Sequence, residues 1–425
     1  MKKLRKFIIH ITPKPILDKI RPQYHLFLNW LGKVYYRNPS KDITVIGVTG
    51  TKGKSSVTEI LRNILTEHGY KVASVSTIHF TIGEITEKNL YKMTMPGRFF
   101  LQKFIRRAVT ENCSHIIIEM TSEGARLNRH RYIEMDCLIF TNLSPEHIES
   151  HGSFANYKAA KLKLAEQLSN SKKQKRTIIA NSDDEHGKDF LKTPVEKKLP
   201  YSLKDLQLHM LHKDSISLTF PEITIRAPFV GIFNVYNLLA SITYARSIDI
   251  SWKTIESALR THPPIKGRVE KFYSKSESTK PITVVVDYAH TTNSLEQLYK
   301  AFPDTYKICV LGNTGGGRDT WKRPEMASIA ESYCDKIFLT NEDPYDEDPQ
   351  SILNDMYKGI VNKKKVEMIL DRKKAISKAI EIAPAHSHVI ISGKGTDPFI
   401  MGPDGLKEPW SDASIVKEIL ENKDI

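Results

Sequence analysis

The sequence predicts an α/β protein of two domains, each built on a mainly parallel β-sheet. Short apolar runs that end in a polar residue or glycine alternate with helical patterns along most of the chain, as in doubly wound sheets. A glycine-rich loop follows the first of these runs. The 425 residues exceed the usual length of one domain, and 40% of them are hydrophobic, which is enough for a large core.

Residues 1–42 predict a short helical extension ahead of the first strand. Residues 2–6 are basic, and the apolar run at residues 7–9 is too short for a secretory signal peptide. No apolar segment approaches the length needed to span a membrane. We therefore expect a cytoplasmic protein without an integral membrane segment.

Residues 43–67, ITVIGVTGTKGKSSVTEILRNILTE, predict a strand, a glycine loop and a helix. Such a loop directs backbone N–H groups and a helix N-terminus at a phosphate chain. Lys54 can reach the terminal phosphates of a nucleotide, and the Ser55 hydroxyl can bind magnesium. The alternative is a glycine turn between core elements, but the strand–loop–helix context favours nucleotide binding. The residues expected to contact ATP here are Gly50, Thr51, Lys52, Gly53, Lys54, Ser55 and Ser56.

Several further apolar runs end in polar residues or glycine, and ligands of parallel sheets gather beyond such strand ends. The residues at these ends are Glu119, Thr141, Asn142, Asp287, Gly312, Asn313, Thr340, Asn341 and Gly393. Residues 206–225 alternate between apolar and polar, which predicts an antiparallel flap. A His-Pro-Pro sequence at residues 262–264 predicts a linker, so we expect one domain over 43–265 and a second over 266–425.

The composition narrows the classes of partner. The formal net charge is +14, but the lysines are dispersed and no aromatic-interleaved basic stripe or nucleic-acid-binding motif occurs, so we expect no nucleic-acid partner. A basic surface that attracts polyanionic small molecules is the better interpretation. The four cysteines lack metal-site spacing, so we expect buried, reduced thiols and no zinc.

Eight motifs, in the same order, resemble those of the Mur ligase superfamily, and most closely the UDP-N-acetylmuramoyl-tripeptide synthetases. They are GVTGTKGKSS, FTNLSPEHIESHG, YKAAKLKL, GIFNVYN, GRVE, VDYAH, GGGRDTWKRP and SGKGTD. The resemblance implies a central P-loop ATPase domain, a Rossmann-like C-terminal ligase domain, and residues 1–42 in place of a full N-terminal domain. It also implies an ATP- and Mg²⁺-dependent ligase of peptidoglycan precursor synthesis that adds an amino acid to a muramoyl-peptide-like carboxylate through an acyl phosphate.

The resemblance implies catalytic and nucleotide-binding roles for single residues. Glu119 and His147, with Ser55, match the magnesium-binding positions, and Lys161 matches a lysine that many of these ligases carry as a carbamate. A solvated helix lysine is the alternative for Lys161. Arg268 matches a contact to the γ-phosphate. Asn234 and Asn237 match contacts near the adenine, and Asp287 matches a contact to the ribose. ATP would then lie between the two domains.

The substrate-binding positions are implied in the same way. Thr94 belongs to what remains of the acceptor motif, and Arg318, Gly393 and Asp397 match contacts to the amino acid's α-carboxylate and amine. Diaminopimelate-adding members read DNPR where this chain reads EDPY, residues 342–345. Tyr345 cannot replace the arginine fork that binds a second carboxylate, and Glu342 and Asp343 add negative charge. We therefore expect a pocket for a distal ammonium, as in lysine or ornithine, or for a small neutral amino acid.

Three other functions stay open on the sequence. A different branch of the superfamily, such as a folylpolyglutamate-like or cyanophycin-like ligase, is the main alternative. A non-ligase P-loop ATPase or kinase would not need the Asn pair, Arg268 and a second domain. A nucleic-acid-binding protein is the least favoured. We expect a monomer whose partners are ATP, an amino acid and the acceptor.

Overall fold

The computed structural model describes residues 14–97, 99–146, 148–274, 281–317 and 319–422. The chain divides into two compact units, and each is treated by itself. Unit 1 comprises the described residues of Met1–Pro145, with His151–Asp205 and Leu238–Ile255. Unit 2 comprises those of Glu146–Ser150, Leu206–Asn237 and Glu256–Ile425.

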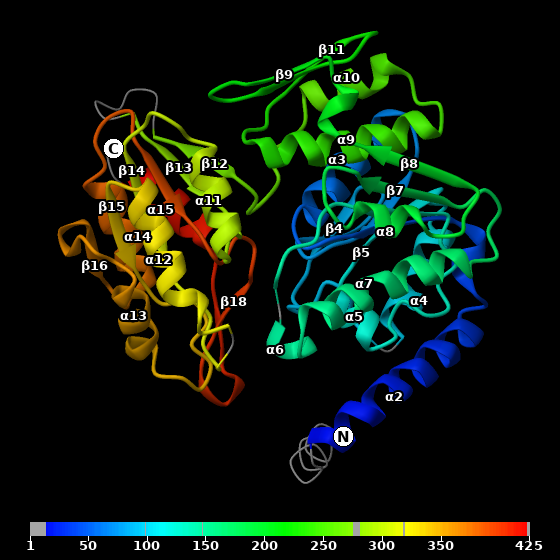
Figure 1. Cartoon of the computed structure of the whole chain (residues 1–425), viewed down its shortest axis with the longest axis horizontal. Helices are drawn as coiled ribbons and strands as arrows, with labels where there is room; N and C mark the ends of the chain where they lie inside the picture. Colours follow the sequence, from blue (N-terminus) through cyan, green and yellow to red (C-terminus); the bar gives the residue numbers. More distant parts are fainter. Residues whose placement is uncertain (1–13, 98, 147, 275–280, 318, 423–425) are drawn as a thin grey trace. The chain divides into compact units, whose positions relative to one another are not determined.

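Unit 1 is built on an eight-stranded sheet in the order β4-β3-β2-β5-β1-β6-β7-β8 (Figure 1). Six strands, from β2 to β8 in that order, run parallel, and β3 and β4 are antiparallel additions at one edge. The strands are β1 (Thr44–Thr49), β2 (Val72–Val75), β3 (His79–Ile82), β4 (Ile85–Lys88), β5 (His115–Met120), β6 (Cys137–Phe140), β7 (Thr177–Asn181) and β8 (Lys197–Tyr201).

Helices surround this sheet and connect its strands. They are α2 (Lys14–Tyr35), η1 (Pro39–Asp42), α3 (Lys54–Glu67), α4 (Phe100–Thr110), α5 (Ser122–Arg126), α7 (Phe154–Ser169), α8 (Gly187–Leu191) and η2 (Leu203–Asp205). Three more helices contribute residues to both units: α6 (Ile148–His151), α9 (Ile232–Ser247) and α10 (Trp252–Arg260). Among the described residues, no helix combines the length and apolar character needed to cross a membrane.

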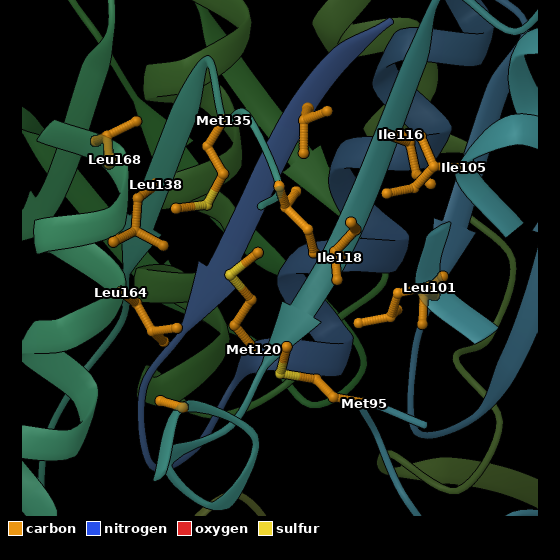
Figure 2. Close-up of a cluster of buried hydrophobic side chains, with 14 of the residues drawn as sticks. Met95, Leu101, Ile105, Ile116, Ile118, Met120, Met135, Leu138, Leu164 and Leu168 are labelled. Carbon is orange, nitrogen blue, oxygen red and sulfur yellow. The ribbon is translucent and has the colours of Figure 1, made fainter. Parts of the chain in front are cut away.

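One face of the sheet carries a continuous hydrophobic core (Figure 2). Ile116 and Ile118 of β5 point to this face because side chains alternate along a strand. Leu101 and Ile105 of α4 pack on them, while α7 supplies Leu164 and its neighbours farther along the sheet. Nearly all residues of the central strands β1, β5 and β6 are buried, and ligands of parallel sheets gather beyond the carboxyl ends of such strands.

Unit 2 contains a six-stranded sheet, a three-stranded sheet and a two-stranded ribbon. In the order β12-β13-β17-β14-β15-β16, only β12 is antiparallel to its neighbour. The strands are β9 (Leu208–Leu211), β10 (Ile216–Thr219), β11 (Thr224–Ala227), β12 (Glu270–Tyr273), β13 (Thr283–Val286), β14 (Lys307–Leu311), β15 (Lys336–Leu339), β16 (Val366–Met368), β17 (His388–Ile391), β18 (Phe399–Met401) and β19 (Lys407–Pro409).

The six-stranded sheet of unit 2 is buried on both faces. Val285 belongs to one core cluster and its neighbour Val284 to the other, as the alternation of a strand requires. The first cluster is completed by α11, α12 and α13, and the second by α14 and α15. The helices are α11 (Thr292–Lys300), α12 (Lys322–Tyr333), α13 (Pro349–Lys358), η3 (Lys363–Lys365), α14 (Arg372–Glu381), η4 (Pro403–Gly405) and α15 (Asp412–Asn422).

Most predicted elements are confirmed, and one chemical prediction is wrong. The apolar runs before Glu119, Asp287 and Gly312 are strands, residues 206–225 form an antiparallel sheet, and a helix precedes the first strand. The prediction of reduced thiols fails for Cys309 and Cys334, which form a disulfide between β14 and the end of α12. The two cysteines, separated by 25 residues, come together because α12 ends just before β15, the strand that pairs with β14.

Candidate active site

The glycine loop lies at the carboxyl ends of the central strands of unit 1, where it joins β1 to α3. Gly50 and Gly53 both have positive φ, +150° and +84°. A Cβ at Gly50 would collide with the Thr141 hydroxyl, so the loop can pass this point only as glycine. Gly53 is the N-cap of α3, which leaves the first N–H groups of that helix available to an anion.

The end of β6 holds the loop in its curled form. The Lys52 N–H donates to Asn142 Oδ1 at 2.9 Å, and Asn142 Nδ2 and the Thr141 hydroxyl donate to Lys52 O at 3.1 and 2.7 Å. The Thr51 N–H donates to Asn142 O at 2.8 Å, and the Thr51 hydroxyl lies 3.0 Å from that of Tyr157. Sequence reasoning placed Thr141 and Asn142 at a strand end but missed this role, and gave Tyr157 no role.

Two lysine ammonium groups meet at one carbonyl of the loop. Lys54 Nζ donates to Gly50 O at 2.9 Å and to Thr51 O at 2.8 Å. Lys161 Nζ, from α7, donates to the same Gly50 O at 2.7 Å and lies over the Tyr157 ring. The Lys161 residue is only 2% exposed, so it is not a solvated helix lysine. Ser55 and Ser56 lie in the first turn of α3, directly after Lys54, and are buried.

Glu119 lies at the end of β5 and is fully buried. Its Oε1 accepts the Thr77 N–H at 3.2 Å, and its Oε2 accepts the Thr77 hydroxyl at 3.0 Å. The Thr77 hydroxyl is in turn 2.8 Å from that of Thr94. The predicted magnesium-binding carboxylate and the predicted acceptor-binding threonine are therefore joined through Thr77, a residue that sequence reasoning missed.

In unit 2, Asn234 and Asn237 are buried on the first turns of α9. Asn237 Nδ2 donates to Asn234 Oδ1 at 2.9 Å, and Asn234 Nδ2 donates to Val230 O at 2.9 Å. The spacing of three residues brings the two amides together on one helix face, as the sequence predicts. Each amide orients the next, which fixes where the pair presents its remaining donors and acceptors.

Arg268 and Asp287 lie in adjacent loops of unit 2. The Asp287 carboxylate accepts the Val269 N–H at Oδ2 and the Ala289 N–H at Oδ1, both at 2.7 Å. The Arg268 guanidinium lies 4.6 Å from the centre of the Tyr288 ring. Burial, with Asp397 nearby, raises the pKa of Tyr288, so this phenol stays neutral. Asp287 thus ties the GRVE loop to the VDYAH loop and holds Arg268 near a neutral aromatic face.

The predicted amino-acid pocket gathers three loops of unit 2. Asp343 Oδ1 accepts from Lys394 Nζ and from the Met401 N–H, both at 2.8 Å. Lys394 also pairs with Asp397 at 3.3 Å. The negative charge that the sequence leads us to expect from Asp343 is therefore offset by a buried lysine, which Asp343 shares with Asp397. Tyr345, with φ +53°, lies beside Gly316 of the GGGRD loop.

Glu342 differs from Asp343 because it has no cationic partner at hydrogen-bond distance among the described residues. Thr314 donates to its Oε1 at 3.1 Å, while its buried Oε2 has no hydrogen-bond partner in the described part of the chain. Burial raises the pKa of Glu342. A Cβ at Gly393 would collide with Glu342 Oε2, and Gly393 also has φ +104°. Any residue other than glycine at this position would therefore displace the Glu342 carboxyl group.

Two predicted site residues, His147 and Arg318, lie outside the described residues. Within the described ranges, no group of three or more His, Cys, Asp or Glu side chains has a metal-binding arrangement. Magnesium prefers oxygen ligands. The Ser55 hydroxyl in the loop and the Glu119 carboxylate at the end of the neighbouring strand β5 are oxygen ligands of this kind. Both come from the same edge of one parallel sheet, since Thr49 of β1 pairs with Met120 of β5.

Comparison with known proteins agrees with this arrangement. Residues 48–245 match the Mur ligase middle domain and residues 267–395 the Mur ligase glutamate ligase domain. The UDP-N-acetylmuramoyl-L-alanyl-D-glutamate–2,6-diaminopimelate ligase of Syntrophomonas wolfei is 33% identical over 417 residues, covering 95% of this chain and 83% of the relative. The enzyme of the same name from Aquifex aeolicus is 34% identical over 397 residues, covering 91% and 79%.

Solved structures extend the comparison. A structure of a UDP-N-acetylmuramoyl-L-alanyl-D-glutamate–2,6-diaminopimelate ligase matches with a TM-score of 0.60 and 25% identity, covering 89% of this chain and 78% of the other. Mycobacterium tuberculosis folylpolyglutamate synthase matches with a TM-score of 0.71 but 11% identity, covering 94% and 96%, and so shows a shared fold alone. The predicted fold class and the predicted class of ATP-dependent acid–amino-acid ligase are confirmed, and the chain belongs to the Mur ligase family.

Proposed function

We propose that this ligase joins the amine of a free amino acid to the carboxylate of a muramoyl-peptide-like acceptor, with an acyl phosphate as intermediate. The convergence of Lys54 and Lys161 on the Gly50 carbonyl carries the proposal. The half-buried Lys54 ammonium fits the transfer of a phosphoryl group, whose charge it would offset, and Lys161 would stand at the same point of the loop as a carbamate.

The residues at the phosphate loop and around it have different proposed roles in binding ATP and magnesium. The α3 N–H groups and Lys54 hold the phosphates of ATP, and Thr51, Lys52 and Ser56 belong to the same cradle. Ser55 and Glu119, with His147, would hold magnesium, which when bound neutralises phosphate charge. Lys161 would act as a carbamate near that ion. Asn234 and Asn237 are the proposed adenine contacts, Asp287 the ribose contact and Arg268 the γ-phosphate contact.

We also propose which residues bind the acceptor and which bind the amino acid. Thr94, hydrogen-bonded to Thr77, binds the acceptor near Glu119. Arg318, Gly393 and Asp397 hold the amino acid's α-carboxylate and amine. The named relatives add 2,6-diaminopimelate, but Tyr345 stands where a carboxylate-binding arginine is needed. The unpartnered Glu342 Oε2 supports a distal ammonium instead, because an ammonium would supply the missing donor.

We also propose that the enzyme works as a monomer in the cytoplasm, since its substrates are small molecules. The division into 43–265 and 266–425 remains our proposal for its domains.

A phosphate-release assay tests the function. Purified enzyme is incubated with ATP and magnesium and a panel of amino acids, with and without UDP-muramoyl-dipeptide. We expect phosphate release that requires both acceptor and amino acid, and a peptide product seen by mass spectrometry. Lys54→Ala should abolish release, and Lys163→Ala, an exposed lysine of α7, is the matched control. Release that needs no acceptor would indicate an ATPase and contradict the proposal.

A further inference from the structure

Helix α2 presents an apolar stripe to solvent. Ile20, Tyr24, Phe27, Leu31 and Val34 are spaced by four and three residues, so they lie on one face. Each of them is between 37% and 56% exposed. Trp30 and Tyr35 flank the stripe and are exposed as well. We call these seven residues the α2 stripe.

The opposite face of α2 is the one that packs on unit 1, and its contacts there are polar or small. Asn29 is buried and donates from Nδ2 to Asn128 O at 2.7 Å. Gly32 is buried against Phe99 and Gln102. A helix of a globular protein normally turns its apolar stripe inward, and α2 does the reverse. Within the described part of the chain, the α2 stripe is thus an exposed apolar surface on a helix whose opposite face packs on unit 1.

The formal charge of the sequence that contains the stripe indicates its partner. Residues 1–40 contain nine Lys or Arg and one acidic residue, Asp18, for a formal net charge of +8 within the chain's +14. Arg21 lies beside the stripe by helical geometry, about 100° from Ile20 around the axis, whereas Lys33 is turned toward unit 1, where its ammonium lies 5.4 Å from the centre of the Tyr132 ring. Like charges would repel a second copy of the same helix, whereas an anionic surface would attract it.

We propose that α2 is an interfacial helix that docks the enzyme on anionic lipid bilayers. Aromatic and aliphatic side chains of the stripe enter the headgroup region, and the basic residues contact anionic headgroups; the two signals together give binding that either alone would leave weak. The helix lies on the surface and does not span the bilayer. The exposed residues Leu90, Tyr91 and Met93, in the loop before the proposed acceptor-binding Thr94, add apolar surface in the same unit.

The loop and the helix are close neighbours. Arg129 donates to Met95 O at 2.8 Å, and both Arg129 and His25 of α2 lie against Gly97. Because His25 lies about 140° from Ile20 around the axis, docking through α2 would leave the acceptor loop behind the helix, on the side away from the lipid. A soluble ligase activity does not depend on this contact, so the proposal stands apart from the proposed function.

Cosedimentation of the full chain with lipid vesicles tests the proposal. One set of vesicles contains phosphatidylcholine alone, and the other also contains phosphatidylglycerol. We expect binding to the second set, weakened by added salt, with a blue shift of fluorescence that is lost in Trp30→Phe. Phe27→Ser should weaken binding roughly tenfold or more, and Arg21→Gln roughly fivefold.

Matched controls separate the stripe from general effects. Met210→Ser removes an equally exposed apolar side chain from β9, and Lys364→Gln removes an exposed charge from η3; both should bind like the wild type. Phosphate release with soluble substrates should be unchanged in Phe27→Ser, which shows that it is folded. Absence of binding, or equal binding to both vesicle sets, would overturn the proposal. A dimer that dissociates in Phe27→Ser without any vesicle binding would overturn it too, and would assign the stripe to self-association.

Discussion

Replacing Tyr345 by arginine should move the enzyme's selectivity toward meso-diaminopimelate. In the present pocket a second carboxylate would meet no guanidinium at this position. A charge-assisted hydrogen bond contributes about 1.5–3 kcal/mol, which corresponds to roughly a ten- to hundredfold change in kcat/KM. Tyr345 has φ +53°, a conformation that arginine adopts at the same cost as tyrosine, so the backbone strain cancels between the two proteins.

The assay compares kcat/KM for lysine, ornithine, alanine and meso-diaminopimelate on one acceptor. Wild type should prefer lysine, ornithine or a small neutral amino acid, and Tyr345→Arg should raise the diaminopimelate-to-lysine ratio by the factor given above. Tyr345→Gln, polar but uncharged, is the matched control and should change the ratio little. Glu342→Gln should lower activity with lysine or ornithine selectively. A wild-type enzyme that already prefers diaminopimelate would refute the reasoning, as would an unchanged ratio in Tyr345→Arg.

Three further predictions concern a carbamate, a histidine and a disulfide. Lys161→Ala should lose most activity, and a small carboxylic acid should restore part of it, whereas Lys163→Ala should keep its activity. Full activity of the enzyme in CO₂-free buffer, with no carbamate found by mass spectrometry, would contradict the role of Lys161. Burial lowers the pKa of His130 to about 3, below the usual 6.5, so its neutral form stabilises the fold above pH 6.5 and that stability is lost as the pH falls. The free energy of unfolding should fall by about 2 kcal/mol between pH 7 and pH 5 because of this residue, as measured by thermal unfolding. An equal fall in the His130→Gln variant would contradict the assignment to His130. Alkylation of denatured, unreduced protein should label two of the four cysteines, and labelling of all four would exclude the Cys309–Cys334 bond.

The sequence predicted the parts of the site whose signal is local. Gly50, Gly53 and Lys54 are recognisable because a phosphate loop needs glycine and lysine at fixed short spacings. The strand before Glu119 was equally visible, since a buried parallel strand is a continuous apolar run. The contact between Asn234 and Asn237 follows from helical spacing, whereas their role near the adenine comes from the family resemblance and stays a prediction.

Contacts between distant segments could not be read in that way. Asn142 holds Lys52 across 90 residues, and Lys394 neutralises Asp343 across 51. Both depend on strand order, which brings loops together at one sheet edge without any local pattern. The Cys309–Cys334 disulfide was missed for the same reason: the compartment argument favoured thiols, and only the return of α12 to the sheet brings the two sulfur atoms together.

The bonds from Thr141 and Asn142 to Lys52 bear on the thermodynamics of ATP binding. A loop that is already ordered loses little conformational entropy when the nucleotide arrives, so more of the interaction free energy remains as affinity. Loosening it, as in Asn142→Ala, would make nucleotide binding enthalpically similar but entropically more costly. Calorimetric titration with a non-hydrolysable ATP analogue would separate these two contributions, and would show whether a neighbouring strand, as well as the loop's own glycines, determines how tightly the phosphates are held.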